Sequence, residues 1–208
     1  MKSGLDFYKK DTAYRMLKKE MLNRYGKEQT ERIWEKAGRK LEQLWNEFPD
    51  VHKAQQHHTH SEIFPRVAMY RALQEELPEQ AMAIMDDAVK IAGEQAGKLI
   101  GALVRLPGMK KEFLRVMDVM LKKMFGQEAG FAQRDYPAGK DALKFDITMC
   151  PYCKYCELCG CPELTHNFCD SDVYCYGDLP GIRFERTQTL GTGGYCCDFH
   201  FTLKRNEG

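Results

Sequence analysis

The sequence predicts an α+β protein in which about five helices pack on a small, mostly antiparallel C-terminal sheet. Apolar residues recur at helical spacing through residues 1–136, whereas strand-like alternation begins only after Pro137. All nine cysteines also lie in the second part. We therefore expect one domain, with a helical part at 1–136 and a cysteine-rich α+β part at 137–208.

Five amphipathic segments account for the helical part. In order, they cover Leu5–Tyr25, Ile33–Phe48, Ser61–Leu77, Met82–Leu103 and Phe113–Met124. Gly26 is typical of a helix C-terminus and should end the first segment. Pro65 is tolerated in the first turn of the third segment, which Pro78 should end. Pro107 bounds the fourth segment.

Three segments of the second part alternate as strands do. Lys144–Met149 is the first, and residues 182–190 and 195–203 should form a β-hairpin around the glycine-rich sequence GTGG. One face of the last strand carries Tyr195, Cys197, Phe199, Phe201 and Leu203, and the other carries Cys196, Asp198, His200 and Thr202. The apolar face should pack on the helices.

The composition excludes several partners. The formal net charge is +1, so no overall field attracts nucleic acid or an anionic membrane. No segment approaches the roughly 20 apolar residues that a membrane helix needs, and the N-terminal residues do not resemble a signal peptide. We expect a cytoplasmic protein whose partner is a small-molecule substrate, with an oligomer left open.

The cysteines indicate reduced thiols. They number nine, an odd count, and all lie between Cys150 and Cys197. A secreted disulfide scaffold usually has an even count spread along the chain. These thiols are therefore candidate nucleophiles or metal ligands.

A metal centre is the alternative interpretation of the densest cysteine run, which contains Cys150, Cys153, Cys156, Cys159 and Cys161. Closely spaced cysteines often bind Zn²⁺ or an Fe–S cluster. However, the run lacks the CxxxCP spacing of bacterial ferredoxins, and three-residue steps drift around a helix. We expect no cofactor, and an Fe–S or Zn site remains the alternative.

The sequences DITMCPYC, GCPELT, FCDSD and RFERTQTLGTGGYCCDFHF follow one another in an order that resembles the L-2-amino-thiazoline-4-carboxylic acid hydrolase family. HTHSEIFPRVAMYRAL is similar to the third helix of that family. The positions that match the family pattern are Cys150, Pro151, Pro162, Glu163, Cys169, Asp172, Arg186, Thr187, Thr189, Cys197 and Asp198. The remaining cysteines depart from that pattern.

The resemblance implies a reaction in which water adds to an amidine carbon and opens a thiazoline ring, giving an N-carbamoyl thiol acid. Such chemistry needs a nucleophile, an acid/base group and a cation for the substrate carboxylate. Cys150 or Cys169 is the candidate nucleophile, and the N-terminus of a following helix should lower the pKa of Cys150. Asp172 and His60 are candidate acid/base groups.

Four further positions complete the predicted substrate site. Arg186 is the candidate cation for a carboxylate, and Thr187 and Thr189 offer hydroxyls from one face of their strand. Cys197 and Asp198 are further substrate-binding candidates, although Cys197 shares a face with core phenylalanines. The pocket should lie between the third helix and the sheet, lined by Cys150, Asp172 and Arg186.

Three functional classes are consistent with these observations. The first is a cysteine-assisted hydrolase acting on C–N bonds of small cyclic amidines or amides, and the resemblance favours it. The second is an Fe–S or Zn-binding protein, and the third is a non-catalytic sensor or carrier of a small molecule.

The odd cysteine count leads to a first prediction. Thiol titration of the denatured, unreduced protein should detect most of the nine cysteines, because the predicted state is reduced. Recovery of a single thiol would require four disulfides and would contradict the assignment to a reducing compartment.

Overall fold

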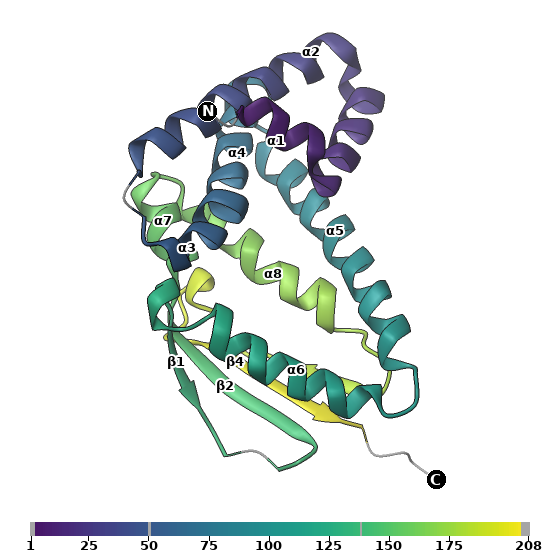
Figure 1. Cartoon of the computed structure of the whole chain (residues 1–208). Coiled ribbons are helices and arrows are strands. Elements are labelled where there is room, and N and C mark those ends of the chain that lie inside the picture. Colours follow the sequence, from purple (N-terminus) through teal and green to yellow (C-terminus); the bar gives the residue numbers. More distant parts are fainter. Residues whose placement is uncertain (1–2, 50, 138, 205–208) are drawn as a thin grey trace.

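The computed structural model describes residues 3–49, 51–137 and 139–204, and it stacks a helical layer on a layer that contains the sheet (Figure 1). The helical layer contains α1 (Gly4–Lys10), α2 (Thr12–Glu47), α3 (Lys53–His58), α4 (Phe64–Glu76) and α5 (Ala81–Val104). The second layer contains α6 (Met109–Met124), β1 (Ala132–Asp135), β2 (Ala142–Met149), α7 (Pro151–Leu158), α8 (Thr165–Tyr176), β3 (Ile182–Glu185) and β4 (Cys197–Leu203). The α+β prediction is confirmed.

The first predicted helix is two helices. Asp11 ends α1 and caps α2, because its Oδ1 accepts hydrogen bonds from the backbone N–H groups of Ala13 and Tyr14. At Gly26 the backbone leaves helical geometry, with φ 77° and ψ 173°, so α2 consists of two helices that meet at a kink, and the first of them ends at Gly26 as predicted. Among the described residues, no helix has both the length and the apolar character needed to cross a membrane.

The third predicted helix begins earlier than expected. Helical structure starts at Lys53 rather than near Ser61, and it passes through the π-helical turn η1 (Thr59–Ile63) before α4. His52, whose Nδ1 accepts from the N–H of Ala54, caps the start of α3. His57, His58 and His60 therefore lie within helical turns.

The sheet is entirely antiparallel, with the strand order β1-β2-β4-β3. Phe145 of β2 pairs with Phe199 of β4, and their rings stack with centroids 4.9 Å apart. Cys197, Phe199 and Phe201 are buried on one face, as predicted. In Figure 1, the helices α6 and α8 cover this face of the sheet.

Three details of the sheet differ from prediction. The strand β1 lies within the part expected to be all helical. The hairpin strands are shorter than expected, because β3 ends at Glu185 and β4 begins at Cys197. The connection between them is an irregular loop at 186–196, so Tyr195 lies outside the strand and is 81% exposed.

The helix α8 was not predicted, and its position depends on close packing against α5. A Cβ atom on Gly97 would lie 2.8 Å from the carbonyl oxygen of Cys175, and one on Gly93 would lie 2.6 Å from Cβ of Tyr174. Side chains at these positions would hold the two helices apart. Small residues on α5 thus determine how closely α8 lies to it, and α8 carries Cys169 and Asp172.

This packing generates a prediction about stability. We expect Gly97→Ala to lower the free energy of unfolding by about 1–3 kcal/mol, because the new methyl group contacts the α8 backbone. Gly101→Ala is the matched control, since its Cβ would lie 3.4 Å from Cδ of Pro180, an ordinary contact. This control should be neutral or stabilise by about 0.5–1 kcal/mol through helix propensity. Equal denaturation midpoints in urea would contradict the packing argument.

Candidate active site

A cavity of about 280 Å³ lies between the helices and the sheet. The turn η1 and the first turns of α4 line it on one side, α6 and α8 on others, and β2 and β4 form its floor. Its charged and sulfur-containing residues are Glu62, Arg66, Met117, Met120, Met124, Cys150, Cys169, Asp172 and Cys197. The cavity therefore lies where the sequence predicted a pocket, between the third predicted helix and the sheet.

Cys169 on α8 is the thiol in this cavity whose pKa is lowered most clearly. The Cys197 thiol donates a hydrogen bond to Cys169, and the Thr189 hydroxyl and the Gly191 N–H donate two more. The Arg186 guanidinium adds a positive charge nearby. Together these groups outweigh the effect of burial and lower the pKa of Cys169 to about 6. Cys169 is therefore mostly a thiolate at neutral pH.

Asp172 lies one turn after Cys169 on the same face of α8. Arg186 Nη1 donates to Asp172 Oδ2 at 2.9 Å and to the carbonyl oxygen of Cys169 at 2.8 Å. Burial nevertheless raises the pKa of Asp172 to about 7, against the effect of Arg186. A carboxyl with this pKa can both donate and accept a proton near neutral pH.

Arg186 takes a different position from the predicted one. Its side chain is only 6% exposed, and it does not line the cavity. Its Nη1 atom is already occupied by Asp172 and by the backbone of α8. Arg186 therefore joins the loop after β3 to α8, and the geometry gives it a positioning role rather than contact with a substrate carboxylate.

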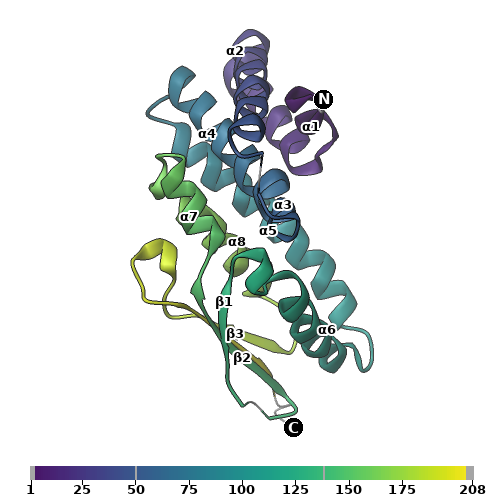
Figure 2. The same cartoon turned by 60° about the vertical axis from the view of Figure 1, so that its left-hand side comes forward.

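The loop at 186–196 brings the donors to Cys169. Its residue Gly191 packs against Thr165 and Cys169 of α8, and Figure 2 shows the loop in yellow beyond the end of the sheet. A Cβ atom on Gly191 would lie 2.9 Å from Sγ of Cys169, so only glycine permits this approach. The GTGG sequence that was predicted to form a simple hairpin turn thus supplies a contact to the thiolate.

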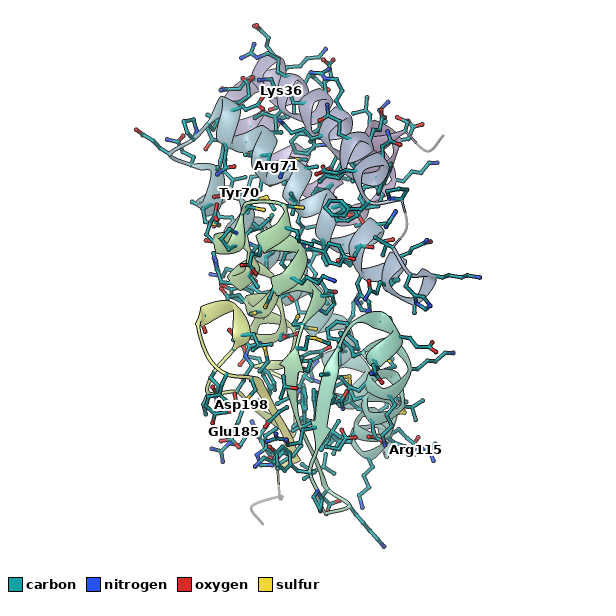
Figure 3. The ribbon with its side chains drawn as sticks, turned by 90° about the vertical axis from the view of Figure 1, so that its left-hand side faces the viewer. Lys36, Tyr70, Arg71, Arg115, Glu185 and Asp198 are labelled. Atoms are coloured by element: carbon teal, nitrogen blue, oxygen red, sulfur yellow. The ribbon has the colours of Figure 1, made fainter. Side chains whose placement is uncertain are left out.

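Hydrogen bonds between Thr187 and Asp198 hold this loop on β4. Asp198 accepts hydrogen bonds from the Thr187 hydroxyl at 2.6 Å and from the N–H groups of Thr187 and Gln188. These bonds lower the pKa of Asp198 despite its partial burial. Figure 3 places Asp198 beside Glu185 on the sheet. Of the predicted substrate-binding residues, Thr189 and Cys197 contact Cys169, whereas Thr187 and Asp198 support the loop.

Cys150 lines the cavity, but its pKa is not lowered as predicted. A hydrogen bond with the Cys153 side chain and burial raise the pKa of Cys150, and the same hydrogen bond lowers the pKa of Cys153. Cys150 precedes α7, and the backbone N–H groups of Tyr152 and Cys153 favour its thiolate. That contribution is smaller than the opposing effects of the Cys153 hydrogen bond and of burial.

The cysteines of the alternative metal site do not converge. Cys156 forms a hydrogen-bonded pair with Cys161, separate from the pair of Cys150 and Cys153. Cys159 lies near Arg71 of α4, which donates a hydrogen bond to the carbonyl oxygen of Cys159. Figure 3 shows Arg71 in the helical layer. Among the described residues, no three His, Cys, Asp or Glu side chains are grouped as metal ligands. The five cysteines of this run thus lie in different environments: two hydrogen-bonded pairs, and Cys159 beside Arg71.

His60 is not brought to the cavity. Its Nδ1 lies 2.9 Å from the Thr59 hydroxyl, and its ring packs beside Phe64 with centroids 5.4 Å apart. The neighbouring His58 is buried instead, between the Tyr152 hydroxyl at 3.0 Å and the carbonyl oxygen of Met124 at 2.8 Å. Burial lowers the pKa of His58, which indicates a neutral ring that joins α3, α6 and α7.

Sequence reasoning missed Glu62 and Arg66, the charged residues that the third predicted helix contributes to the cavity. Their side chains form an ion pair at 3.7 Å, and burial raises the pKa of Glu62. The Arg66 guanidinium lies over the Phe168 ring, 4.4 Å from its centroid. The signal was present in the sequence, because these two charges four residues apart flank the apolar residues of SEIFPRVAMY.

Comparisons with known proteins identify one family. A family model described as L-2-amino-thiazoline-4-carboxylic acid hydrolase matches residues 56–201, which is more than half of the chain. The matched range includes every residue of the cavity described above. Neither the curated proteins nor the solved structures contain a match.

The hydrogen bonds to Cys169 predict its reactivity. Its alkylation by iodoacetamide should rise with pH and reach half of its maximal rate near pH 6, because the thiolate is the nucleophile. Thr189→Val should move this midpoint to higher pH by removing one donor, whereas Thr148→Val, which removes a hydroxyl that donates to the carbonyl oxygen of Ala132, should not. Mass spectrometry of tryptic peptides would identify the modified cysteine. First modification at Cys150 would contradict the assignment.

Proposed function

This chain belongs to the L-2-amino-thiazoline-4-carboxylic acid hydrolase family, and from that premise we propose that it is a cysteine-assisted hydrolase that opens a small cyclic amidine ring. Family membership supports a hydrolase that acts on a ring of the thiazoline type. One observation carries the finer proposal: the thiolate of Cys169 lies one helical turn from a carboxyl of pKa about 7 in the same cavity. The two groups are a nucleophile and an acid/base catalyst.

In the first step, the Cys169 thiolate adds to the amidine carbon between the ring sulfur and the ring nitrogen. A bond forms between Sγ and this carbon, and the C=N electron pair moves to nitrogen. When the ring carbon–sulfur bond breaks, the protonated Asp172 donates its proton to the departing sulfur. The products are a free substrate thiol and an isothiourea attached to Cys169.

In the second step, water removes the product from Cys169. The Asp172 carboxylate takes a proton from water as the water oxygen adds to the same carbon. Breakage of the bond between Sγ and carbon returns the thiolate and leaves an N-carbamoyl thiol acid. The sum of both steps is the addition of one water molecule to the ring.

The surrounding residues serve these two steps. The donors from Cys197, Thr189 and Gly191 keep Cys169 a good leaving group in the second step, because they stabilise its thiolate. Arg186 orients Asp172 through the hydrogen bond to Oδ2 and stays outside the cavity. Burial of Asp172 keeps its proton available near neutral pH, which the first step requires.

Cysteine variants test the proposal. Cys169→Ser should lower kcat by several powers of ten for ring opening of 2-amino-thiazoline-4-carboxylate, because serine is a far poorer nucleophile at neutral pH. Cys150→Ser should cause a milder loss, since its hydrogen bond with Cys153 and its burial raise the pKa of Cys150 and so disfavour its thiolate. A dominant loss for Cys150→Ser would transfer the nucleophile to Cys150. Equal, mild losses would favour water activated by Asp172.

Product analysis completes the same experiment. A new thiol, counted colorimetrically after protein removal, indicates breakage of the ring carbon–sulfur bond. Breakage of the ring C–N bond, the bond expected for the broader class, would release an amine and leave the sulfur carbamoylated. The product mass is the same in both cases, so the thiol count distinguishes them.

The pKa values also predict the pH dependence of kcat/KM. The rate should rise with pH near 6 as Cys169 becomes a thiolate, and it should fall above about 7 as Asp172 loses the proton that it donates. Initial rates between pH 5 and 9 would measure both limbs. A rate that still increases above pH 8 would exclude Asp172 as the proton donor of the first step.

A further inference from the structure

The proposed reaction does not explain the environment of Arg66. Its Nη1 atom is buried and has no hydrogen-bond partner among the described residues. The contact with Glu62, at 3.7 Å, is made by Nη2. Phe168 holds the guanidinium plane from one side, and the side chain lines the cavity that contains Asp172. A buried donor without a partner is costly, so this geometry points to an anionic group that completes it when a ligand binds.

The opposite side of the cavity is apolar and extensive. Met117, Met120, Leu121 and Met124 of α6 face Phe145 and Phe199 of the sheet. Methionine side chains adapt their shape to different apolar ligands. None of these six side chains can contribute acid/base or nucleophilic chemistry, so the proposed ring opening does not require them.

The volume of the cavity is close to that of a site for a drug-sized ligand. Its volume of about 280 Å³ approaches the lower limit of about 300–1,000 Å³ typical of drug-sized ligands. A second cavity of about 290 Å³ shares Glu62, Arg66 and Asp172 with it. A five-membered ring with one amine and one carboxylate would occupy only the polar end, beside Cys169, Asp172 and Arg66.

We propose that the substrate of this chain is a carboxylate-bearing heterocycle that also carries an apolar alkyl or aryl substituent. Arg66 binds the carboxylate through its unpaired Nη1, and the wall formed by α6 and the sheet binds the substituent. The heterocycle rests on the proposed function, but the two binding contacts do not depend on Cys169 chemistry. This assignment replaces Arg186, the predicted cation, whose Nη1 is occupied by Asp172.

Ligands that contain no hydrolysable ring test the binding contacts separately. Isothermal titration with the full chain would compare 3-phenylpropanoate, propanoate and 3-phenylpropan-1-ol. Burial of the phenyl group should make 3-phenylpropanoate bind at least about tenfold more tightly than propanoate. The charge-assisted hydrogen bond should make it bind at least about tenfold more tightly than the alcohol.

Matched variants assign each contact. Arg66→Gln should weaken 3-phenylpropanoate binding about tenfold and leave the alcohol unaffected, because only the carboxylate contacts Nη1. Arg71→Gln is its control, a variant of a second arginine on α4 that donates to Cys159. Met120→Asp should weaken both phenyl ligands, whereas Val119→Asp, the adjacent and more exposed position outside the cavity, should weaken neither. Circular dichroism would confirm that each variant is folded.

The outcomes separate this proposal from the hydrolase proposal. Tight 3-phenylpropanoate binding by Cys169→Ala, without ring opening by the wild type, would support the binding site and contradict the hydrolase. Equal binding of propanoate and 3-phenylpropanoate by folded wild type would overturn the substrate class, even if unsubstituted thiazoline is hydrolysed. Unchanged binding in Arg66→Gln would also overturn it.

Discussion

The Arg186 guanidinium joins α8 to the loop after β3, and it contacts both Cys169 and Asp172 of the candidate site. Arg186 directly follows β3, and its Nη1 atom donates hydrogen bonds both to the Asp172 side chain and to the backbone carbonyl oxygen of Cys169. The ring of Phe199 lies 5.7 Å from this guanidinium and shields it. Because one buried cation contacts both Cys169 and Asp172, the positions of the proposed nucleophile and of the proposed acid/base group are linked.

The pairing of thiols gives the cysteines of this chain different pKa values. In each of the three hydrogen-bonded pairs, one sulfur donates and the other accepts, so the pKa of one thiol falls and that of its partner rises. Only the pair of Cys169 and Cys197 also has a hydroxyl, a backbone N–H and a guanidinium directed at the accepting sulfur. Reactivity therefore follows from the donors around a thiol rather than from the number of cysteines.

Much of the architecture could be predicted because local patterns report it. The apolar stripes of α5 and α6 and the alternation in β2 and β4 lie within a few residues of the observed elements. The helix α8 could not be recognised in the same way, since THNFCDSDVYCY has no clear apolar stripe and is stabilised by packing against the glycines of α5. The irregular loop at 186–196 was missed because Thr187 and Thr189 also suit a strand.

The amino-acid sequence was sufficient to identify the α+β class, the family, and the cysteines, Asp172 and Arg186 as candidate reactive groups. The environment of each group depends on the tertiary structure. The pKa of a thiol or a carboxyl depends on burial and on donors that come from distant segments, and sequence spacing contains neither. Cys169 is activated by groups from the loop and from β4, Cys150 is paired with Cys153, and Arg66 enters the cavity from another layer of the fold.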